Sequence, residues 1–146
     1  MKLALSLLIG AALLAQNANA LEWRWSYQGK GVSASGAFTT TDAPDADGFY
    51  EITGIAGEAN GVAIAGLTPK GTSVPGNDGY PVDNLIRTSA PQLTKNGFGY
   101  ALADGTYVNA FYGAHFAKAD YYAFFSDPAH AQSSEPAVAF TAEIVP

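Results

Sequence analysis

The chain has 146 residues, no cysteine, and thirteen acidic against seven basic residues, which gives a net charge of −6 at pH 7. An acidic surface without a basic stripe repels phosphate groups, so nucleic acid and anionic lipid are poor candidate partners. The absence of cysteine excludes a disulfide scaffold and leaves ordinary burial as the source of stability. Charged residues are only 14% of the chain. Together with abundant Gly and aromatic residues, this favours paired strands and turns over helices.

Residues 1–20 have the three-part pattern of a secretory leader. Lys2 is followed by an apolar run from Leu3 to Ala15, and the segment ends in the small-x-small triplet Ala18-Asn19-Ala20. The run is shorter than the roughly 20 residues that a membrane-spanning helix needs. We therefore predict a secreted or periplasmic protein with no membrane span after leader cleavage, and one domain over residues 21–146. Loss of Lys2 makes the mature chain one unit more negative.

The first mature segment predicts a strand with an aromatic face. Trp23, Trp25 and Tyr27 alternate with polar residues, the period of a strand. The three rings either fill a core or form a platform that stacks on sugar rings. The core is favoured, because a small domain without disulfides needs this buried area. A glycan-binding platform at these residues is the alternative. A turn at residues 28–31 then leads to a small-residue strand over residues 32–40.

Three aspartates gather in the loop that follows this strand. Asp42, Asp45 and Asp47 stand beside Gly48, and carboxylates are the hard oxygen ligands that Ca²⁺ prefers. Pro44 interrupts the spacing of an EF-hand loop, and no glutamate closes such a loop. A solvated turn is therefore the expectation, and a calcium site is the alternative.

Residues 49–67 predict a β-hairpin around which the other strands are arranged. Apolar and polar residues alternate on both sides of the segment 57–61, where Asn60-Gly61 favours a tight reversal. Nothing in this hairpin is suited to act as a nucleophile, a base or a metal cage. Its role is therefore expected to be structural.

The rest of the chain predicts further short strands. A loop rich in Pro and Gly at residues 68–81 is followed by strands at 82–87, 97–102, 106–112, 120–125 and 137–145, with Asp104-Gly105 as a turn signal. About nine strands at regular spacing indicate an all-β antiparallel sandwich or a small, partly closed barrel. The apolar residues predicted to be largely buried are Ile52, Ile64, Leu67, Leu85, Phe98, Tyr100, Phe124 and Phe140.

The sequence contains no recognisable catalytic constellation. His115 and His130 are the only histidines, and neither stands in a motif with a serine nucleophile or a metal-binding partner. Phosphate loops and metalloprotease motifs are absent too. We assign no catalytic and no cofactor-binding residue. A pair of acids such as Glu51 and Asp120 would serve glycoside hydrolysis only if folding brought them together.

Five segments of the mature chain carry a resemblance to a known family: Gly36–Asp42, Tyr50–Ile55, Asn60–Leu67, Asp83–Leu85 and Gly97–Tyr100. They resemble small exported bacterial proteins of the PEP-CTERM class. The resemblance implies an exported surface or matrix protein and transfers no catalytic residues. Members of that class carry a C-terminal Val-Pro-Glu-Pro signal, a transmembrane stretch and a basic tail, whereas this sequence ends at Ile144-Val145-Pro146. We therefore expect the mature protein to be released and not to be anchored in a membrane.

The leading interpretation is an exported, non-enzymatic β-domain that binds or packs in the extracellular matrix, with a polysaccharide or a matrix protein as partner. A small secreted polysaccharide hydrolase, with acids from the Asp42–Glu51 region, is the second. A barrel that carries a ligand inside an aromatic cavity is the third. The shape of the interior and the placement of the acids discriminate among the three.

Overall fold

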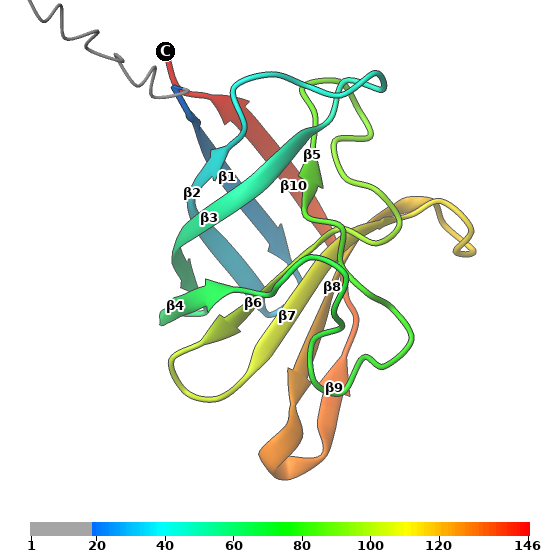
Figure 1. Cartoon of the computed structure of the whole chain (residues 1–146). Helices are drawn as coiled ribbons and strands as arrows, with labels where there is room; N and C mark the ends of the chain where they lie inside the picture. Colours follow the sequence, from blue (N-terminus) through cyan, green and yellow to red (C-terminus); the bar gives the residue numbers. More distant parts are fainter. Residues whose placement is uncertain (1–18) are drawn as a thin grey trace, which may run out of the picture.

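The computed structural model describes residues 19–146, which fold into a single antiparallel β-barrel with extra strands (Figure 1). The prediction of an all-β protein is confirmed. Within these residues the one helical segment is the 3-10 turn η1 (Pro128–His130). The strands are β1 (Leu21–Gly29), β2 (Val32–Thr40), β3 (Tyr50–Ala59), β4 (Val62–Leu67), β5 (Leu85–Ile86), β6 (Phe98–Leu102), β7 (Tyr107–Gly113), β8 (Asp120–Asp127), β9 (Gln132–Ser134) and β10 (Ala137–Ile144).

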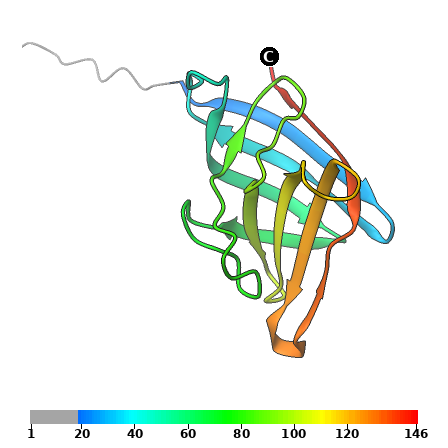
Figure 2. The same ribbon diagram turned by 90° about the vertical axis from the view of Figure 1, so that its right-hand side faces the viewer.

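Eight of the strands close the barrel in the order β10-β1-β2-β3-β4-β6-β7-β8. Closure comes from the pairing of β10 with β8, which sets Ala137 opposite Tyr122 and Val138 opposite Tyr121. The barrel is thus fully closed, and closure removes the exposed edges of the sheet. β5 pairs with β3 outside this circuit, and β9 pairs with β8 in a hairpin that projects from the lower end (Figures 1 and 2).

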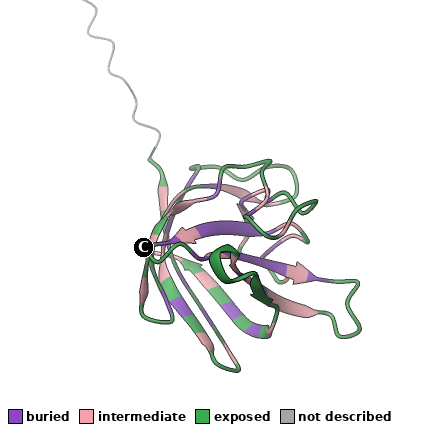
Figure 3. Ribbon diagram, turned by 90° about the horizontal axis from the view of Figure 1, so that it is seen from below, coloured by how far each residue is buried: buried purple, intermediate pink, exposed green. Residues whose placement is uncertain are grey.

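The interior is filled by aromatic side chains. The buried and exposed residues of β1 alternate, so that Trp23, Trp25 and Tyr27 point inward and are at most 3% exposed. The Trp25 ring stacks on Phe38 with centroids 5.2 Å apart, and Phe98 meets Phe38 edge to face at 4.9 Å. An eight-stranded barrel is just wide enough for side chains to fill it. Figure 3 shows the alternation of buried and exposed residues along the strands.

The central hairpin forms at the residues that favour it, with one correction. Asn60 and Gly61 both have positive φ, 48° and 77°, as a two-residue reversal between twisted strands requires. The turn is tighter than the 57–61 segment expected from the sequence, because β3 continues through Gly57 and Glu58. Gly57 pairs with Gly36 across β2 and β3, and a Cβ on Gly36 would lie 1.9 Å from the Ala56 carbonyl oxygen. The two glycines therefore allow this close approach.

The expected strand at residues 82–87 is mostly wrong. Only Leu85–Ile86 pairs as β5, because Asn84 takes the left-handed conformation at φ 53°. The Asn84 side chain donates to the Thr68 carbonyl at 2.8 Å and accepts from the Gly99 amide at 3.4 Å. The Asn84 side chain thus forms hydrogen bonds with two backbone groups that a continuous strand would otherwise have paired.

The set of apolar residues predicted to be buried is partly correct. Half of them are buried, and the other half are only half-buried. The buried residues are Ile52, Phe98, Tyr100 and Phe140; the half-buried ones are Ile64, Leu67, Leu85 and Phe124.

Replacing Ile52 by Ala is expected to cost about 2–5 kcal/mol of unfolding free energy, because this side chain is 2% exposed and the change leaves a cavity. Ile64→Ala should cost less, since Ile64 is half-buried and loses less contact area. Urea unfolding of the two variants beside the parent protein measures both values. A loss below about half a kcal/mol at Ile52 would contradict a core role for β3.

Within residues 19–146, no helix has the length and apolar character that a membrane span requires. The leader predicted for residues 1–20 falls, up to residue 18, outside the described residues.

Candidate functional site

The first predicted site, the aromatic face of β1, lies inside the barrel. The side chains of Trp23, Trp25 and Tyr27 are at most 3% exposed. A surface glycan platform at these three residues is therefore wrong, and the favoured alternative, the core, is what the structure has. Trp23 Nε1 donates to Thr40 Oγ1 at 2.9 Å, which satisfies the one polar atom of that side chain.

The second predicted site, the acidic loop, is an exposed turn. Asp42, Asp45 and Asp47 are all exposed. The Asp45 carboxylate accepts hydrogen bonds from the backbone N–H groups of Asp47 and Phe49, each at 2.9 Å, and so stabilises the turn. Among residues 19–146, no three His, Asp or Glu side chains are grouped in a way that would hold a metal ion. The Asp45 side chain therefore has a structural role in this turn.

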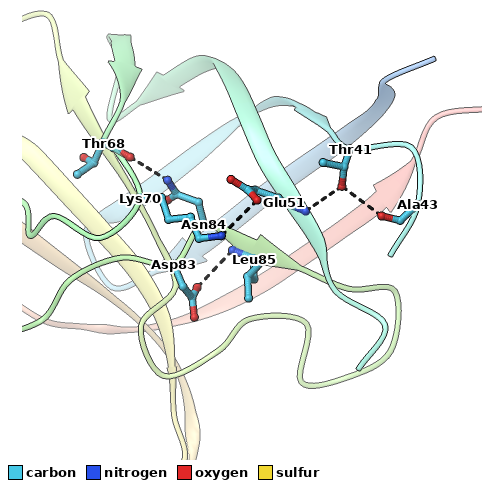
Figure 4. Close-up of polar contacts among 8 residues, drawn as sticks. All are labelled: Thr41, Ala43, Glu51, Thr68, Lys70, Asp83, Asn84 and Leu85. Atoms are coloured by element: carbon cyan, nitrogen blue, oxygen red, sulfur yellow. Dashed lines mark hydrogen bonds and ion pairs between the residues drawn. The ribbon is translucent and has the colours of Figure 1, made fainter. Parts of the chain in front are cut away.

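The acids considered for hydrolysis are separately engaged. Glu51 forms an ion pair with Lys70 at 3.2 Å, and its backbone N–H donates to Thr41 Oγ1 (Figure 4). Asp120 pairs with Lys118, also at 3.2 Å. Each carboxylate therefore has a lysine as its charge partner, and the structure does not bring Glu51 and Asp120 together as a catalytic pair.

A groove of about 570 Å³ lies on the outer wall of the barrel. Its floor comes from the outward-facing residues of β7 and β8, Asn109, Phe111 and Phe124. This volume lies within the usual range of ligand sites. We call it the outer groove and define it by its lining residues, which are Asn77, Gly79, Tyr80, Lys95, Asn96, Asn109, Phe111–Phe116, Phe124 and Glu135.

Aromatic side chains dominate one end of the outer groove. Phe116 packs against Phe111 with centroids 5.6 Å apart and against Tyr122 at 4.4 Å, and Phe111 stacks on Tyr122. Phe116 is nevertheless 40% exposed, and Tyr80, which also lines the groove, is 65% exposed. These are the two large hydrophobic side chains that the described surface exposes most. Exposed rings that line a hollow are typical of binding surfaces.

The wall that carries Tyr80 is fixed to the barrel, although it belongs to a long loop. Val74 is fully buried, and Ser126 Oγ donates to the Pro75 carbonyl at 2.6 Å. Asn77 Nδ2 then donates to Asn109 Oδ1 at 3.1 Å. Three anchors within four residues hold this part of the loop against β7 and β8, beside which it runs in Figures 1 and 2. A wall that is already ordered loses less entropy on binding.

Asn109 joins two walls of the outer groove. Its side chain is 2% exposed, and its amide nitrogen donates to the carbonyls of Asn96 and Phe98 at 3.0 and 3.1 Å. The same side chain accepts the hydrogen bond from Asn77. All hydrogen-bonding groups on one buried side chain are thus used to hold the loops at residues 74–80 and 94–97 in place.

The charges around the outer groove are few and of mixed sign. Lys95, His115 and Glu135 line it. Nearby protein atoms partly exclude water from the Glu135 carboxyl, and this desolvation raises its pKa above the ordinary value. Glu135 is the one carboxylate among the lining residues of the groove. A glycosidase needs two, about 5–10 Å apart.

Comparison of the chain with protein-family models, curated proteins and solved structures finds no match.

The outer groove was not identified from the sequence, although β8 carries a signal for it. Tyr121-Tyr122 and Phe124-Phe125 each place two adjacent rings on opposite faces of a strand. One ring of each pair must therefore lie outside the barrel.

Proposed function

We propose that this protein is an exported, non-enzymatic binding module whose outer groove binds extracellular polysaccharide. The observation that carries the proposal is the aromatic groove itself, with exposed Tyr80 and Phe116 and the amide-bearing residues Asn77 and Asn96 along it. Ring faces stack on the apolar faces of sugars, and amides and backbone groups bond to hydroxyls. The sequence-based interpretation of a secreted matrix-binding protein is retained, but its site moves from β1 to the outer wall.

Two features favour a sugar chain over other ligands. Several residues that line the groove, Tyr80 and Phe116 among them, are exposed, which suits a ligand that continues beyond the site. Its lining has one lysine, one histidine and one glutamate, so it offers no concentrated charge for a strongly ionic partner. The single carboxylate supports binding over hydrolysis, since the second catalytic acid is not among the lining residues.

We expect Tyr80→Ala and Phe116→Ala each to weaken polysaccharide binding about tenfold, because each removes a stacking surface worth about 1–2 kcal/mol. A glycan array on the purified protein identifies the ligand, and calorimetry with the best oligosaccharide measures the affinities. Phe49→Ala is the matched control: Phe49 is a half-buried ring outside the groove, where it contacts the Arg87 guanidinium at 4.6 Å.

The control variant should bind as the parent does. Absence of any glycan ligand, or equal affinities for the parent and both groove variants, would overturn the proposal. Capture of a matrix protein through Tyr80 and Phe116, without glycan binding, would replace polysaccharide by protein as the partner.

A further inference from the structure

A second, smaller recess lies at one end of the barrel, separate from the outer groove. Its volume is about 160 Å³, and its rim includes Asn60 and Asp104, which belong to the β3–β4 and β6–β7 turns. The recess therefore opens where the hairpin turns meet. None of its lining residues belongs to the outer groove. Whatever occupies this recess does so independently of the proposed polysaccharide site.

The walls of the recess are mainly apolar. Val62, Leu102 and Phe125 contribute large side chains, while the alanines at 59 and 123, both nearly fully buried, leave the space that larger residues would fill. An apolar cavity of about 150 Å³ is large enough for a benzene-sized molecule. The recess thus admits a molecule of about that size, and long-chain ligands exceed it.

One charged side chain stands at the rim and disfavours anions. Asp104 accepts hydrogen bonds from the Thr106 hydroxyl at 2.6 Å and from the Thr106 backbone N–H at 3.0 Å, which lowers the pKa of its carboxyl. It is therefore ionised at neutral pH. No lysine, arginine or histidine lines the recess to balance it. A carboxylate ligand would meet repulsion here, whereas an uncharged one would not.

The Tyr27 side chain, which lines the recess, belongs to a hydrogen-bonded pair with one proton to spare. The hydroxyls of Tyr27 and Tyr100 lie 2.5 Å apart, and both side chains are buried. One phenol donates to the other, so the accepting phenol keeps its own proton, and neither hydroxyl makes a second hydrogen bond within residues 19–146. A buried donor without a partner is costly. When Tyr100 donates, the spare proton is that of Tyr27.

We propose that this recess binds a small, uncharged, mainly apolar molecule that carries one hydrogen-bond acceptor, of the class of aromatic ketones. The apolar walls take the ring, and the Tyr27 hydroxyl donates its spare proton to the acceptor. Asp104 excludes the corresponding acids. The recess adds a binding capacity for small organic molecules to the proposed polysaccharide-binding module. It shares no lining residue with the outer groove.

The test uses three probes of similar size: acetophenone, ethylbenzene and benzoate. We expect acetophenone to bind saturably to the purified protein, with shifts in the NMR signals of residues around the recess. Ethylbenzene, which lacks the acceptor, should bind about fivefold more weakly, the effect of one hydrogen bond. Benzoate should not bind. No saturable acetophenone binding, or benzoate binding of equal strength, would overturn the proposal.

Two variants of the tyrosine pair test the hydroxyl directly. Tyr27→Phe should reduce acetophenone binding to the level of ethylbenzene, whereas Tyr100→Phe leaves the Tyr27 proton free and should retain binding. Equal affinities in these two variants would contradict the assigned role of Tyr27. Because both changes replace Tyr by Phe in the same buried pair, each serves as the stability control for the other.

Filling the recess tests its location. Ala123→Leu should abolish acetophenone binding, and Ala59→Leu does the same from the neighbouring strands if the first variant does not fold. Undiminished binding in a folded filled variant would place the ligand elsewhere and overturn the proposal. Phe116→Ala, a change in the outer groove, should leave acetophenone binding unaltered, so failure of the polysaccharide proposal is distinguishable from failure of this one.

Discussion

Replacing Trp25 by Ala is expected to cost about 3–5 kcal/mol of unfolding free energy, the largest loss of any single change described for this protein. Its indole is 1% exposed and contacts the rings of Tyr27, Phe38, Phe98 and Tyr100. Typical domains are stable by only 5–15 kcal/mol, so the variant would lose a large part of its stability. Urea unfolding followed by circular dichroism measures the loss.

The two buried tryptophans provide a sharper comparison. Trp25 Nε1 is the one buried side-chain polar atom of residues 19–146 without a hydrogen-bond partner, whereas Trp23 Nε1 donates to Thr40. Trp25→Phe therefore removes an unsatisfied donor along with some packing, and Trp23→Phe removes a made hydrogen bond. We expect Trp23→Phe to be the more costly of the two by about 1 kcal/mol. A reversed order would show that the Trp25 donor is satisfied in solution.

Raising the pH above 10 is expected to destabilise the protein through Tyr27. Burial raises the pKa of Tyr27 to about 12 and that of Tyr100 well above its usual value, so both phenols stay protonated in the folded state. The unfolded chain releases these protons near pH 10. Because the folded pKa is the higher one, the stabilisation is complete below pH 10 and is lost as the pH rises through about 12.

At pH 11 the loss from Tyr27 alone should be about 1.4 kcal/mol, one pKa unit of linkage. Urea unfolding at pH 8 and pH 11 measures it. The double variant Tyr27→Phe/Tyr100→Phe should lose less stability than the parent protein between these pH values, since it has no buried phenol to ionise. Tyr80→Phe, a change at an exposed ring, is the control and should behave as the parent does. An equal loss in parent and double variant would contradict the prediction.

The local structure of this protein was readable from its sequence wherever neighbours along the chain decide it. The alternation of Trp23, Trp25 and Tyr27 identifies one face of a strand, because successive side chains of a strand point to opposite sides. Asn60-Gly61 specifies a tight turn, because these residues tolerate positive φ. The alternation of residues along a strand shows which side chains share one face of the sheet. It does not state which face is inside, and so the sequence left both the core and the glycan platform open for β1.

The outer groove and the closed barrel depend on contacts between distant parts of the chain. Pairing of Val138 with Tyr121 closes the barrel, and closure turns the rings of β1 inward. The groove needs the loop around Asn77 to lie on Asn109, 32 residues away. Such contacts follow from packing and hydrogen bonding among elements that no local pattern brings together. The sequence by itself therefore determined most of the strands, the turn at Asn60-Gly61 and the all-β class. Only the tertiary structure decided that the rings of β1 fill the core and that Tyr80 and Phe116 stay exposed beside the outer groove, because both outcomes depend on contacts between distant parts of the chain.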